Sequence, residues 1–469
     1  MVFSSLIFLF AFLPITLAAY FLVPFRYRNL VLFAVSLAFY GWGEPLYIFI
    51  MLFSITAAYI FGFFISKHRE TNRKRARVYL AASIIINLTA LLFFKYANFF
   101  LENLSLLPFI PHINPIEGLT LPIGISFYTF QIMSYSIDVY RGDTDSQRSF
   151  VSFGAYVVLF PQLIAGPIVR YRDIADMLSE RKESIRKFAS GAGRFCAGLA
   201  KKVILADSAA AVVESFRIAN EFEPSVLGAW TVVVAYSFQI YFDFSGYSDM
   251  AIGLGRIFGF EFLENFNYPY ISRSITEFWR RWHISLSTWF KEYVYIPLGG
   301  NRKGLGVQYR NIAVVWLLTG FWHGAAWNFV LWGVYFGIIL MLEKTFVLGM
   351  LKRLPAAVGH IYSLLLIMFG WLIFSSSSAA EIWRYLKMMF GSGAALTTSV
   401  ASYDFLRLLP LFMVSIIAST PLIKSLYHRL NKRFAASAYL NPALMGGSLL
   451  LCTAYMVDST FSPFLYYIF

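Results

Sequence analysis

The chain has 469 residues, of which 58% are hydrophobic, 19% aromatic and only 14% charged. Because about 25% of the residues in a typical soluble domain are charged, this composition excludes a soluble globule and indicates an integral membrane protein. The formal net charge of +14 would suggest nucleic-acid binding in a soluble protein, but here the basic residues lie between apolar segments, so we expect the lipid bilayer and no nucleic acid as a partner.

Apolar segments follow one another from end to end and predict an all-α polytopic membrane protein with roughly ten crossings, since one crossing takes about 20 residues. The first segment lacks a basic n-region and is too long for a signal peptide, so we interpret it as a retained transmembrane helix. No polar stretch is long enough for a separate soluble domain, which predicts one membrane-embedded domain over residues 1–469. The predicted spans lie near residues 3–24, 28–42, 45–66, 78–97, 120–140, 226–258, 311–347, 357–377, 404–422 and 438–458. Two of these windows, 226–258 and 311–347, exceed one crossing and contain Gly, Trp and His, so each can hold a span plus a tilted or broken helix.

The segment from Lys67 to Arg77 sets the predicted topology. It carries six basic residues against one acidic residue, and by the positive-inside rule it is cytoplasmic. Counting back through three spans places the N-terminus outside the cytoplasm. The basic stretches 170–187 and 424–433 are also expected to be cytoplasmic, and one last span then places the C-terminus outside.

The apolar segment 148–168 lies between two basic stretches that are predicted to be cytoplasmic. It must therefore leave and return to the same side. Pro161, Gly166 and Pro167 suit a re-entrant hairpin, whose non-helical backbone has to be shielded by protein or to line a watery cavity.

Two carboxylates, Asp243 and Asp249, lie in the aromatic stretch YFDFSGYSDMAIGLG. Acidic residues within a membrane are costly and are therefore functional candidates. Their spacing does not match an EF-hand, and Ser245 lacks the nucleophile-elbow pattern, so neither calcium binding nor a serine nucleophile follows. The alternative is that they cap helices or pair with nearby arginines.

No other stretch of the chain is so polar and so aromatic at once as the one from Glu264 to Arg302. On a helix, its residues Trp279, Trp282, His283 and Trp289 would line much of one side. Such an element lies along the membrane or dips into it rather than spanning it, and Arg280 and Arg281 would reach the cytoplasmic interface. An interfacial aromatic belt would explain the tryptophans but not His283.

A second histidine, His323, lies in the apolar run LLTGFWHGAAWNFVLWG. A buried histidine stays neutral, so one ring nitrogen can accept a proton, as a general base requires. The alternative is a neutral histidine that serves packing only. A zinc site from the two histidines and Asp243 would lack the usual ligand spacing, and we expect no metal. Cys196 and Cys452 are expected to be buried thiols without a chemical role.

At WRRWHISLSTWF and LTGFWHGAAWNF the sequence resembles bacterial membrane-bound O-acyltransferases, the MBOAT family, and especially those that O-acetylate exported polysaccharides. The resemblance extends over nearly the whole chain. It includes MVFSSLIFLF at the N-terminus, KYANFF at 95–100, LPIGISFYTFQIMSYSIDVYRGD at 121–143, LFPQLIAGPIVR at 159–170, YFDFSGYSDMAIGLG at 241–255 and SPFLYYIF at the C-terminus.

The resemblance implies a fold of about 11 transmembrane helices, with re-entrant and interfacial helices around a central funnel. It implies that His323 is the catalytic base and that His283, at the second signature position, orients the thioester or stabilises the oxyanion. The acyl donor would be cytoplasmic, either acetyl-CoA or an acyl-carrier thioester, with no bound cofactor. The protein would lie in the bacterial cytoplasmic membrane and work with an extracytoplasmic SGNH-type O-acetyltransferase on a polysaccharide. The expected substrate channel comprises Asp243, Asp249, Asn265, Arg280, Arg281, Trp282 and Trp322.

The tail 459–469 follows the last predicted span and is expected outside the cytoplasm. Ser462–Pro463 should break the helix there. The resemblance implies that Tyr466, with Tyr467 adjacent, relays the acyl group outward and is a third catalytic residue. The alternative is that these aromatic residues form an interfacial belt.

Two other functions remain open from the sequence. A secondary transporter or channel could use Asp243, Asp249 and the histidines for ions or protons, although no internal repeat is visible. An acyltransferase that modifies lipids or proteins would share the histidines without needing the aromatic tail. The sequence also leaves open which polysaccharide is acetylated. Alginate, peptidoglycan, cellulose and secondary wall polymers are candidates.

Overall fold

The computed structural model describes residues 1–111, 113–433 and 437–458, and in these ranges the backbone forms helices and no β-strand. This confirms the predicted all-α fold class. The contacts within the chain divide it into two compact units. Unit 1 is Met1–Phe195 with Met250–Leu263, and unit 2 is Cys196–Asp249 with the described part of Glu264–Phe469. The prediction of one domain over residues 1–469 stays a prediction.

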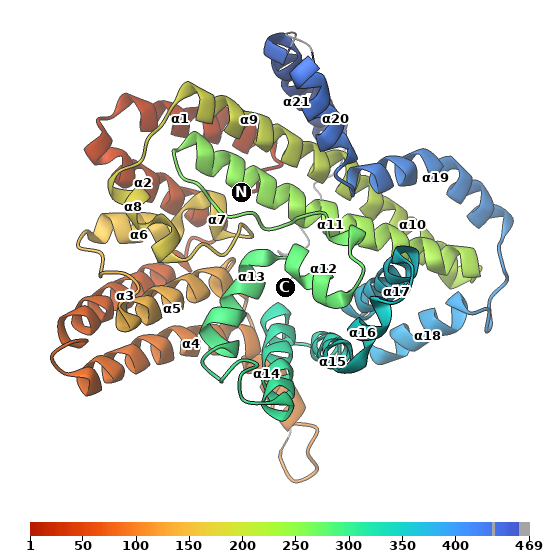
Figure 1. Ribbon diagram of the computed structural model, residues 1–469, viewed down its shortest axis with the longest axis horizontal. Coiled ribbons are helices and arrows are strands. Elements are labelled where there is room, and N and C mark those ends of the chain that lie inside the picture. The colour runs from red at the N-terminus through yellow and green to blue at the C-terminus, as the bar shows by residue number, and fades with distance from the viewer. Residues whose placement is uncertain (112, 434–436, 459–469) are drawn as a thin grey trace. The chain divides into compact units, whose positions relative to one another are not determined.

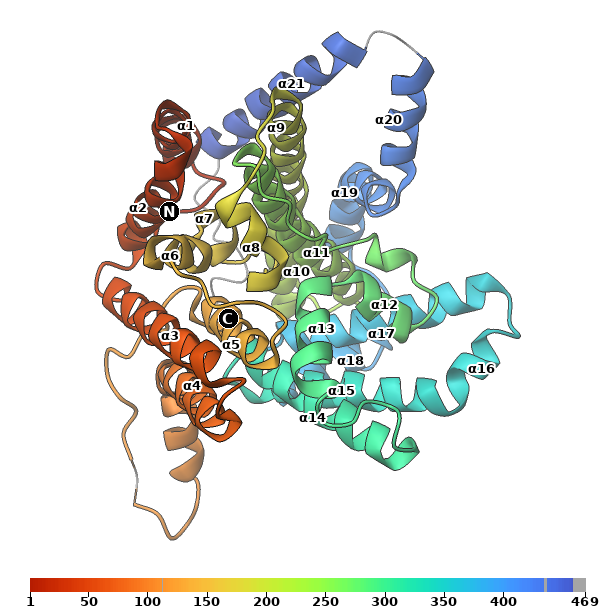
Figure 2. The ribbon, with the colours of Figure 1, turned by 60° about the vertical axis from the view of Figure 1, so that its left-hand side comes forward.

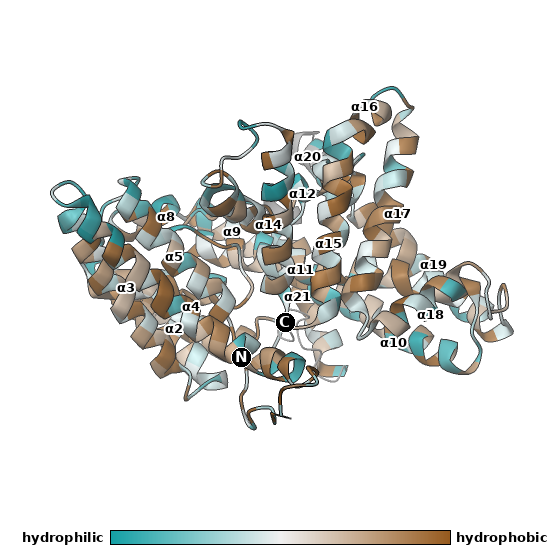
Figure 3. Cartoon of the chain, turned by 90° about the horizontal axis from the view of Figure 1, so that it is seen from below, coloured by the Kyte–Doolittle hydropathy of each residue, from teal (hydrophilic) through white to brown (hydrophobic). Residues whose placement is uncertain are grey.

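Unit 1 is built around three helices, α3, α4 and α5, that lie side by side (Figures 1 and 2). The basic turn between α3 and α4 is held by Asn72, whose side chain caps α4 by accepting a hydrogen bond from the Arg75 amide. Figure 3 shows that most of α3 consists of hydrophobic residues. Phe49, Phe53 and Phe63 on this helix are exposed, as expected of a lipid-facing surface. Its elements are η1 (Phe8–Phe12), α1 (Leu13–Leu22), α2 (Phe25–Gly43), α3 (Ile48–His68), α4 (Arg73–Leu104), α5 (Ile125–Arg141), α6 (Phe150–Val158), α7 (Phe160–Leu163), α8 (Tyr171–Ser179) and most of α9 (Ile185–Ala200).

The predicted re-entrant segment 148–168 forms α6 and α7 with a break at Leu159, whose backbone is not helical. After this break the Phe160 amide donates to Ser36 Oγ at 3.1 Å, so a side chain replaces a helical acceptor. Residues 153–169 are buried. The non-helical backbone is therefore shielded by protein as predicted, whereas its side of the membrane stays a prediction.

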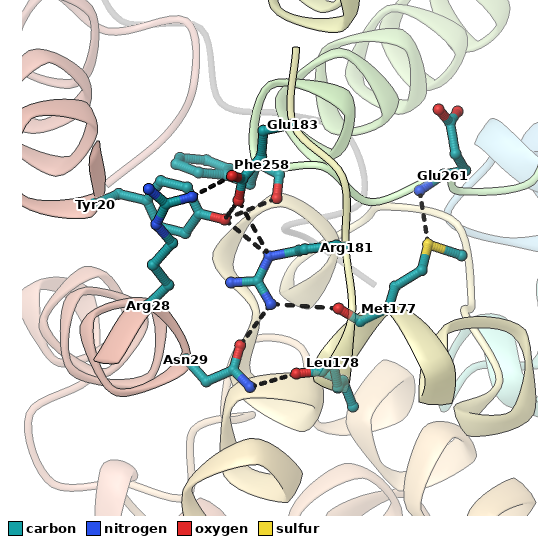
Figure 4. A network of polar contacts seen from close by, with 9 residues as sticks. All are labelled: Tyr20, Arg28, Asn29, Met177, Leu178, Arg181, Glu183, Phe258 and Glu261. Atoms are coloured by element: carbon teal, nitrogen blue, oxygen red, sulfur yellow. Dashed lines mark hydrogen bonds and ion pairs between the residues drawn. The ribbon is translucent and has the colours of Figure 1, made fainter. Parts of the chain in front are cut away.

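A buried polar network centred on Arg181 joins four segments of unit 1 (Figure 4). Arg181 donates to the Tyr20 hydroxyl at 2.8 Å and to Asn29 Oδ1 at 2.7 Å. Glu183 accepts from Tyr20 and pairs with Arg28. The Arg181 guanidinium also lies over the rings of Tyr20, Phe25 and Phe260 at 4.8–5.5 Å from their centroids. Two cations, one carboxylate and several aromatic faces thus lie in contact inside the unit, although Arg28 Nε and Arg181 Nη2 have no hydrogen-bond partner among the described residues.

Unit 2 contains the helix pair α14 and α15, which run together as a hairpin (Figure 2). A Cβ atom on Gly333 would lie 2.4 Å from the Trp316 carbonyl oxygen, and one on Gly320 would lie 2.5 Å from the Phe329 carbonyl oxygen. Only glycine allows this close approach. The elements are η2 (Lys201–Ala206), α10 (Asp207–Phe222), most of α11 (Val226–Ile257), η3 (Pro269–Ile271), α12 (Ile275–Arg281), α13 (Ile284–Phe290), η4 (Lys291–Tyr295), α14 (Leu305–His323), α15 (Trp327–Leu342), η5 (Glu343–Val347), α16 (Leu348–Leu351), α17 (Ala356–Ser375), α18 (Ala379–Met389), α19 (Ser399–Ala418), α20 (Leu422–Arg433) and α21 (Ser437–Asp458).

Among the described residues, six helices are long and apolar enough to cross a membrane, and a shorter apolar helix runs over Phe8–Leu22. They confirm a multi-pass membrane protein. The window 226–258 holds one continuous helix of 32 residues, Val226–Ile257. The suggestion that the helix breaks within this window was therefore wrong. The window 311–347 does break, at Gly324, because α14 ends at His323 and the following residues are extended before α15.

Candidate active site

His283 lies at the corner between α12 and α13 in unit 2. The segment containing Asn265 runs alongside this corner, with the Ile284 amide donating to the Asn265 carbonyl at 3.0 Å and the Asn267 amide donating to the Arg281 carbonyl at 2.9 Å. The backbone of His283 is left-handed, with φ 44° and ψ 55°. This conformation costs a non-glycine residue on the order of 1–3 kcal/mol, so the surrounding contacts must hold it.

The imidazole of His283 is 1% exposed. Its Nδ1 lies 3.1 Å from Asn265 Oδ1, whereas its Nε2 is buried and has no hydrogen-bond partner in the part of the chain that the structure describes. The ring packs edge-on against Phe244 at 4.7 Å between centroids. Burial lowers the pKa of His283 to about 3, so the ring is neutral near neutral pH.

His323 is the last residue of α14 and is 3% exposed. The close α14–α15 contact described above fixes its position. Its ring is enclosed by Trp322, Trp332 and Phe374, with ring centroids 4.9, 5.0 and 5.3 Å away. The structure thus places the second predicted histidine in an aromatic enclosure.

Trp322 connects the surroundings of the two histidines. Its ring centroid lies 5.9 Å from that of His283 and 4.9 Å from that of His323. Trp282 supports the corner from the other side, because its ring packs on Trp371 at 4.8 Å and on Phe266 at 5.1 Å. The sequence predicted both histidines and both tryptophans as site residues, and the structure brings all four into one aromatic cluster.

Asp243 and Asp249 lie on α11 and form ion pairs with lysines of η2. Lys202 Nζ is 2.8 Å from Asp243 and 2.7 Å from Asp207, and Lys201 Nζ is 2.7 Å from Asp249. Burial acts to lower the pKa of Lys202, but the two carboxylates outweigh it and raise that pKa. The structure therefore pairs both aspartates with lysines, where the alternative had named arginines.

The remaining predicted channel residues have different surroundings. Asn265 is fully buried, and its amide is engaged with His283, Ser285 and Ser248. Arg281 pairs with Glu277 at 2.9 Å, one turn away on α12, and Arg280 is exposed. Their assignment to a channel stays a prediction. Tyr466 and the tail 459–469 lie outside the described residues.

Sequence reasoning missed Glu343, which fixes the start of α12. This carboxylate is 1% exposed, and its two oxygens accept hydrogen bonds from the amides of Ile275 and Thr276 at 2.6 and 2.7 Å. A negative charge at a helix N-terminus is favourable, and here it anchors the helix that leads to His283. The signal was available, because an acidic residue in the apolar window 311–347 is itself unusual.

The cluster holds two buried imidazoles among aromatic side chains. Within the described residues no group of three His, Cys, Asp or Glu side chains could hold a metal ion. An imidazole with an unprotonated nitrogen can take a proton from a hydroxyl, and the aromatic walls strengthen polar interactions by lowering the local dielectric constant. The arrangement suits proton transfer in acyl transfer to a hydroxyl.

Comparison with known proteins identifies relatives over most of the chain. Residues 143–379 match the model of the membrane-bound O-acyltransferase family. Both histidines lie within this matched range. A protein named Probable alginate O-acetylase AlgI, from Azotobacter vinelandii, is 45% identical, with 84% of this chain and 79% of that protein covered. The peptidoglycan O-acetyltransferase of Helicobacter pylori is 35% identical over 83% of this chain and 80% of its own length. The teichoic acid D-alanyltransferase of Bacillus subtilis is 28% identical over 50% of this chain and 62% of its own.

Proposed function

The chain belongs to the membrane-bound O-acyltransferase family and is a multi-pass membrane acyltransferase, and from this premise we propose that it transfers acetyl groups from a cytoplasmic thioester toward a polysaccharide of the cell envelope. The observation that carries the proposal is the pair of buried histidines whose rings share contact with Trp322. The relatives named for alginate and peptidoglycan O-acetylation support an acetyl group and an envelope polymer.

In the proposed reaction, His323 is the general base. An unprotonated ring nitrogen of His323 removes the proton of the acceptor hydroxyl, and the oxygen forms a bond to the thioester carbonyl carbon. The carbon–sulfur bond then breaks, and the departing thiolate takes up the proton. The rings of Trp322, Trp332 and Phe374 exclude water, which would otherwise hydrolyse the thioester.

The donor in this proposal is acetyl-CoA, with an acyl-carrier thioester as the other possibility. Basic loops that face the cytoplasm suit the phosphates of CoA. On the outer face, Tyr466 would accept the acetyl group and pass it to an SGNH-type O-acetyltransferase that modifies the polysaccharide. The protein would lie in the bacterial cytoplasmic membrane with both termini outside.

The transporter alternative gains no support from the two aspartates, since Asp243 and Asp249 are engaged in ion pairs with Lys202 and Lys201. Such pairing explains why charged groups are tolerated in a helix that is apolar enough to span a membrane.

The test is turnover of radiolabelled acetyl-CoA by the purified protein in lipid nanodiscs. We expect release of free CoA thiol by the wild type and a loss of about 10²- to 10⁴-fold or more in His323→Ala, the contribution of a general base. His360→Ala, a histidine substitution in α17 outside the cluster, is the matched control. Wild-type turnover in His323→Ala would exclude the base assignment, and solute uptake into liposomes without thiol release would favour a transporter.

For the tail, labelled acetyl recovered on Tyr466 after turnover would support the relay. Full polysaccharide acetylation in cells that carry Tyr466→Phe would exclude it.

A further inference from the structure

We propose that Asn265 is a positioning residue that fixes the proton of His283 on Nδ1, so that His283 presents Nε2 to the substrate as a hydrogen-bond acceptor. The substrate group that donates a hydrogen bond to Nε2 would be neutral, either a hydroxyl or an amide N–H. The inference rests on the proposed acyl transfer and decides between the two roles that the family resemblance leaves open for His283.

The orientation of the Asn265 amide follows from its neighbours. Oδ1 lies 3.2 Å from the Ser285 backbone nitrogen and 2.9 Å from Ser285 Oγ. A backbone N–H can only donate, so the group opposite it has to be the amide oxygen and not the NH₂ group. On the other side, Nδ2 donates to Ser248 Oγ at 3.1 Å, which fits the same orientation.

The tautomer of His283 follows from this orientation. Nδ1 lies 3.1 Å from Asn265 Oδ1, an atom with no proton to give, so Nδ1 has to carry the proton. Ser285 Oγ could donate to an unprotonated Nδ1, but it lies 3.4 Å from Nδ1 and only 2.9 Å from Oδ1. An unprotonated Nδ1 would also face the lone pairs of Oδ1. In the neutral ring, the lone pair is therefore on Nε2.

Nε2 is the atom left for substrate. It is buried and has no hydrogen-bond partner among the described residues, and an unmet acceptor inside a protein costs free energy. The left-handed backbone of His283 adds a second cost. Asn265 offsets these two costs. Its carbonyl accepts a hydrogen bond from the Ile284 amide, and its side chain caps the start of α13 by accepting from the Ser285 amide. Strain and an unmet acceptor at one residue are typical of a site prepared for a ligand.

This arrangement argues against stabilisation of the oxyanion by His283. An oxyanion needs a hydrogen-bond donor, and the neutral Nε2 has no proton. A hydroxyl or an amide N–H, in contrast, would complete the hydrogen bonding of Nε2. An amide of the pantetheine arm of acetyl-CoA carries this chemistry. The acceptor hydroxyl carries it too, but its single proton would then go to His283 in place of His323.

The tautomer can be tested without measuring activity, by NMR of isotope-labelled histidine nitrogens in nanodiscs. The His283 signals are assigned by their absence in His283→Asn. We expect a protonated Nδ1 and an unprotonated Nε2 in the wild type, and a loss of this pattern in Asn265→Leu. A proton on Nε2 in the wild type would overturn the inference, whatever the outcome of the turnover assay.

The second test is the pH profile of turnover. Asn265→Asp keeps the acceptor oxygen but places a carboxylate beside His283, which favours the doubly protonated ring. We expect turnover to fall about 10- to 100-fold near neutral pH, the range for removing a group that orients a histidine, and to recover as the pH rises. A pH-independent loss would show a merely structural role for Asn265 and would contradict the inference. Asn98→Asp is the control, because it makes the same substitution on α4 of unit 1, where the side chain of Asn98 contacts the backbone of Ile116.

Steady-state kinetic constants distinguish the two groups that could donate a hydrogen bond to Nε2 of His283. If an amide of acetyl-CoA occupies Nε2, Asn265→Leu raises KM for acetyl-CoA. If the acceptor hydroxyl occupies it, the same variant lowers kcat and leaves that KM unchanged. Unchanged values of both constants in a correctly folded Asn265→Leu protein would contradict the proposal.

Discussion

The Arg181 network of unit 1 and the histidine cluster of unit 2 are both buried polar groups in an apolar protein, but they are completed differently. Around Arg181, the charged and polar side chains hydrogen-bond to one another and lie against aromatic faces (Figure 4). At His283 only Nδ1 has a hydrogen-bond partner among the described residues, and Nε2 has none. Arg181 Nη2 is also without a partner there, but opposite charges meet around it, whereas His283 is a neutral ring on a left-handed backbone that Asn265 holds in place. This difference favours a role in folding for the first cluster and a ligand for the second.

Breaking the Arg181 network should have the largest effect on stability. Arg181→Met leaves Glu183, Tyr20 and Asn29 with fewer partners, and removing one member of a buried ionic network costs about 3–5 kcal/mol. We expect a large loss of folded protein in thermal unfolding followed by size-exclusion chromatography. Turnover per folded molecule should be unchanged.

Lys187→Met is the control for this prediction, since its pair with Glu261 is at the surface of the same unit and such pairs contribute about 0–1 kcal/mol. If Arg181→Met and Lys187→Met were equally stable, the Arg181 network would not stabilise the fold as we expect.

A substitution at the α14–α15 contact should affect both stability and the site. The added methyl of Gly333→Ala would meet the Trp316 carbonyl, so the two helices must separate, at a cost of about 1–3 kcal/mol. Because α14 ends at His323, we expect turnover to fall further than the folded fraction does. Gly349→Ala, where the added methyl meets nothing within 4 Å, should change neither property. Normal turnover in Gly333→Ala would show that His323 does not depend on this contact.

Loss of a helix cap should have a smaller effect on the free energy of unfolding. Ser274 caps α12 by accepting from the Glu277 amide at 3.0 Å, and Ser274→Ala should cost about 1 kcal/mol. Thr398 caps α19 in the same way at 3.1 Å, away from the histidines. We expect similar shifts in unfolding temperature for Ser274→Ala and Thr398→Ala, with reduced turnover only for Ser274→Ala. Equal turnover of the two variants would argue against α12 as the element that positions His283.

The smallest expected effect on turnover is that of pH on His283 in the wild type. Because burial lowers its pKa to about 3, the folded protein keeps this ring neutral from about pH 8 to about pH 5, and no loss of turnover in that range should come from its protonation. The unfolded chain binds this proton below its ordinary pKa of 6.5, so the residue favours unfolding as the pH falls below 6.5 and is without effect above it. A His283 nitrogen signal that titrates near pH 6.5 in the folded protein would contradict the buried, neutral ring.

The candidate site could be predicted in its main residues from the sequence. His283, His323, Trp282 and Trp322 stand out because a histidine among tryptophans in an apolar run has few structural explanations. Asp243 and Asp249 were also identified, but their lysine partners lie 41 and 48 residues earlier along the chain, and no local pattern links positions so far apart. Glu343 could have been noticed as an acidic residue in an apolar window, but its partners Ile275 and Thr276 come together with it only in the folded unit.

The sequence by itself determined the class of the protein, because the apolar runs and the few charges leave the bilayer as the only solvent for such a chain. It also determined the family, through motifs along nearly the whole length. Only the tertiary structure decided how α11 continues through a window expected to break, and which nitrogen of His283 carries the proton. Both depend on contacts between residues distant in sequence, and the second is decided by the oxygen of Asn265, 18 positions away.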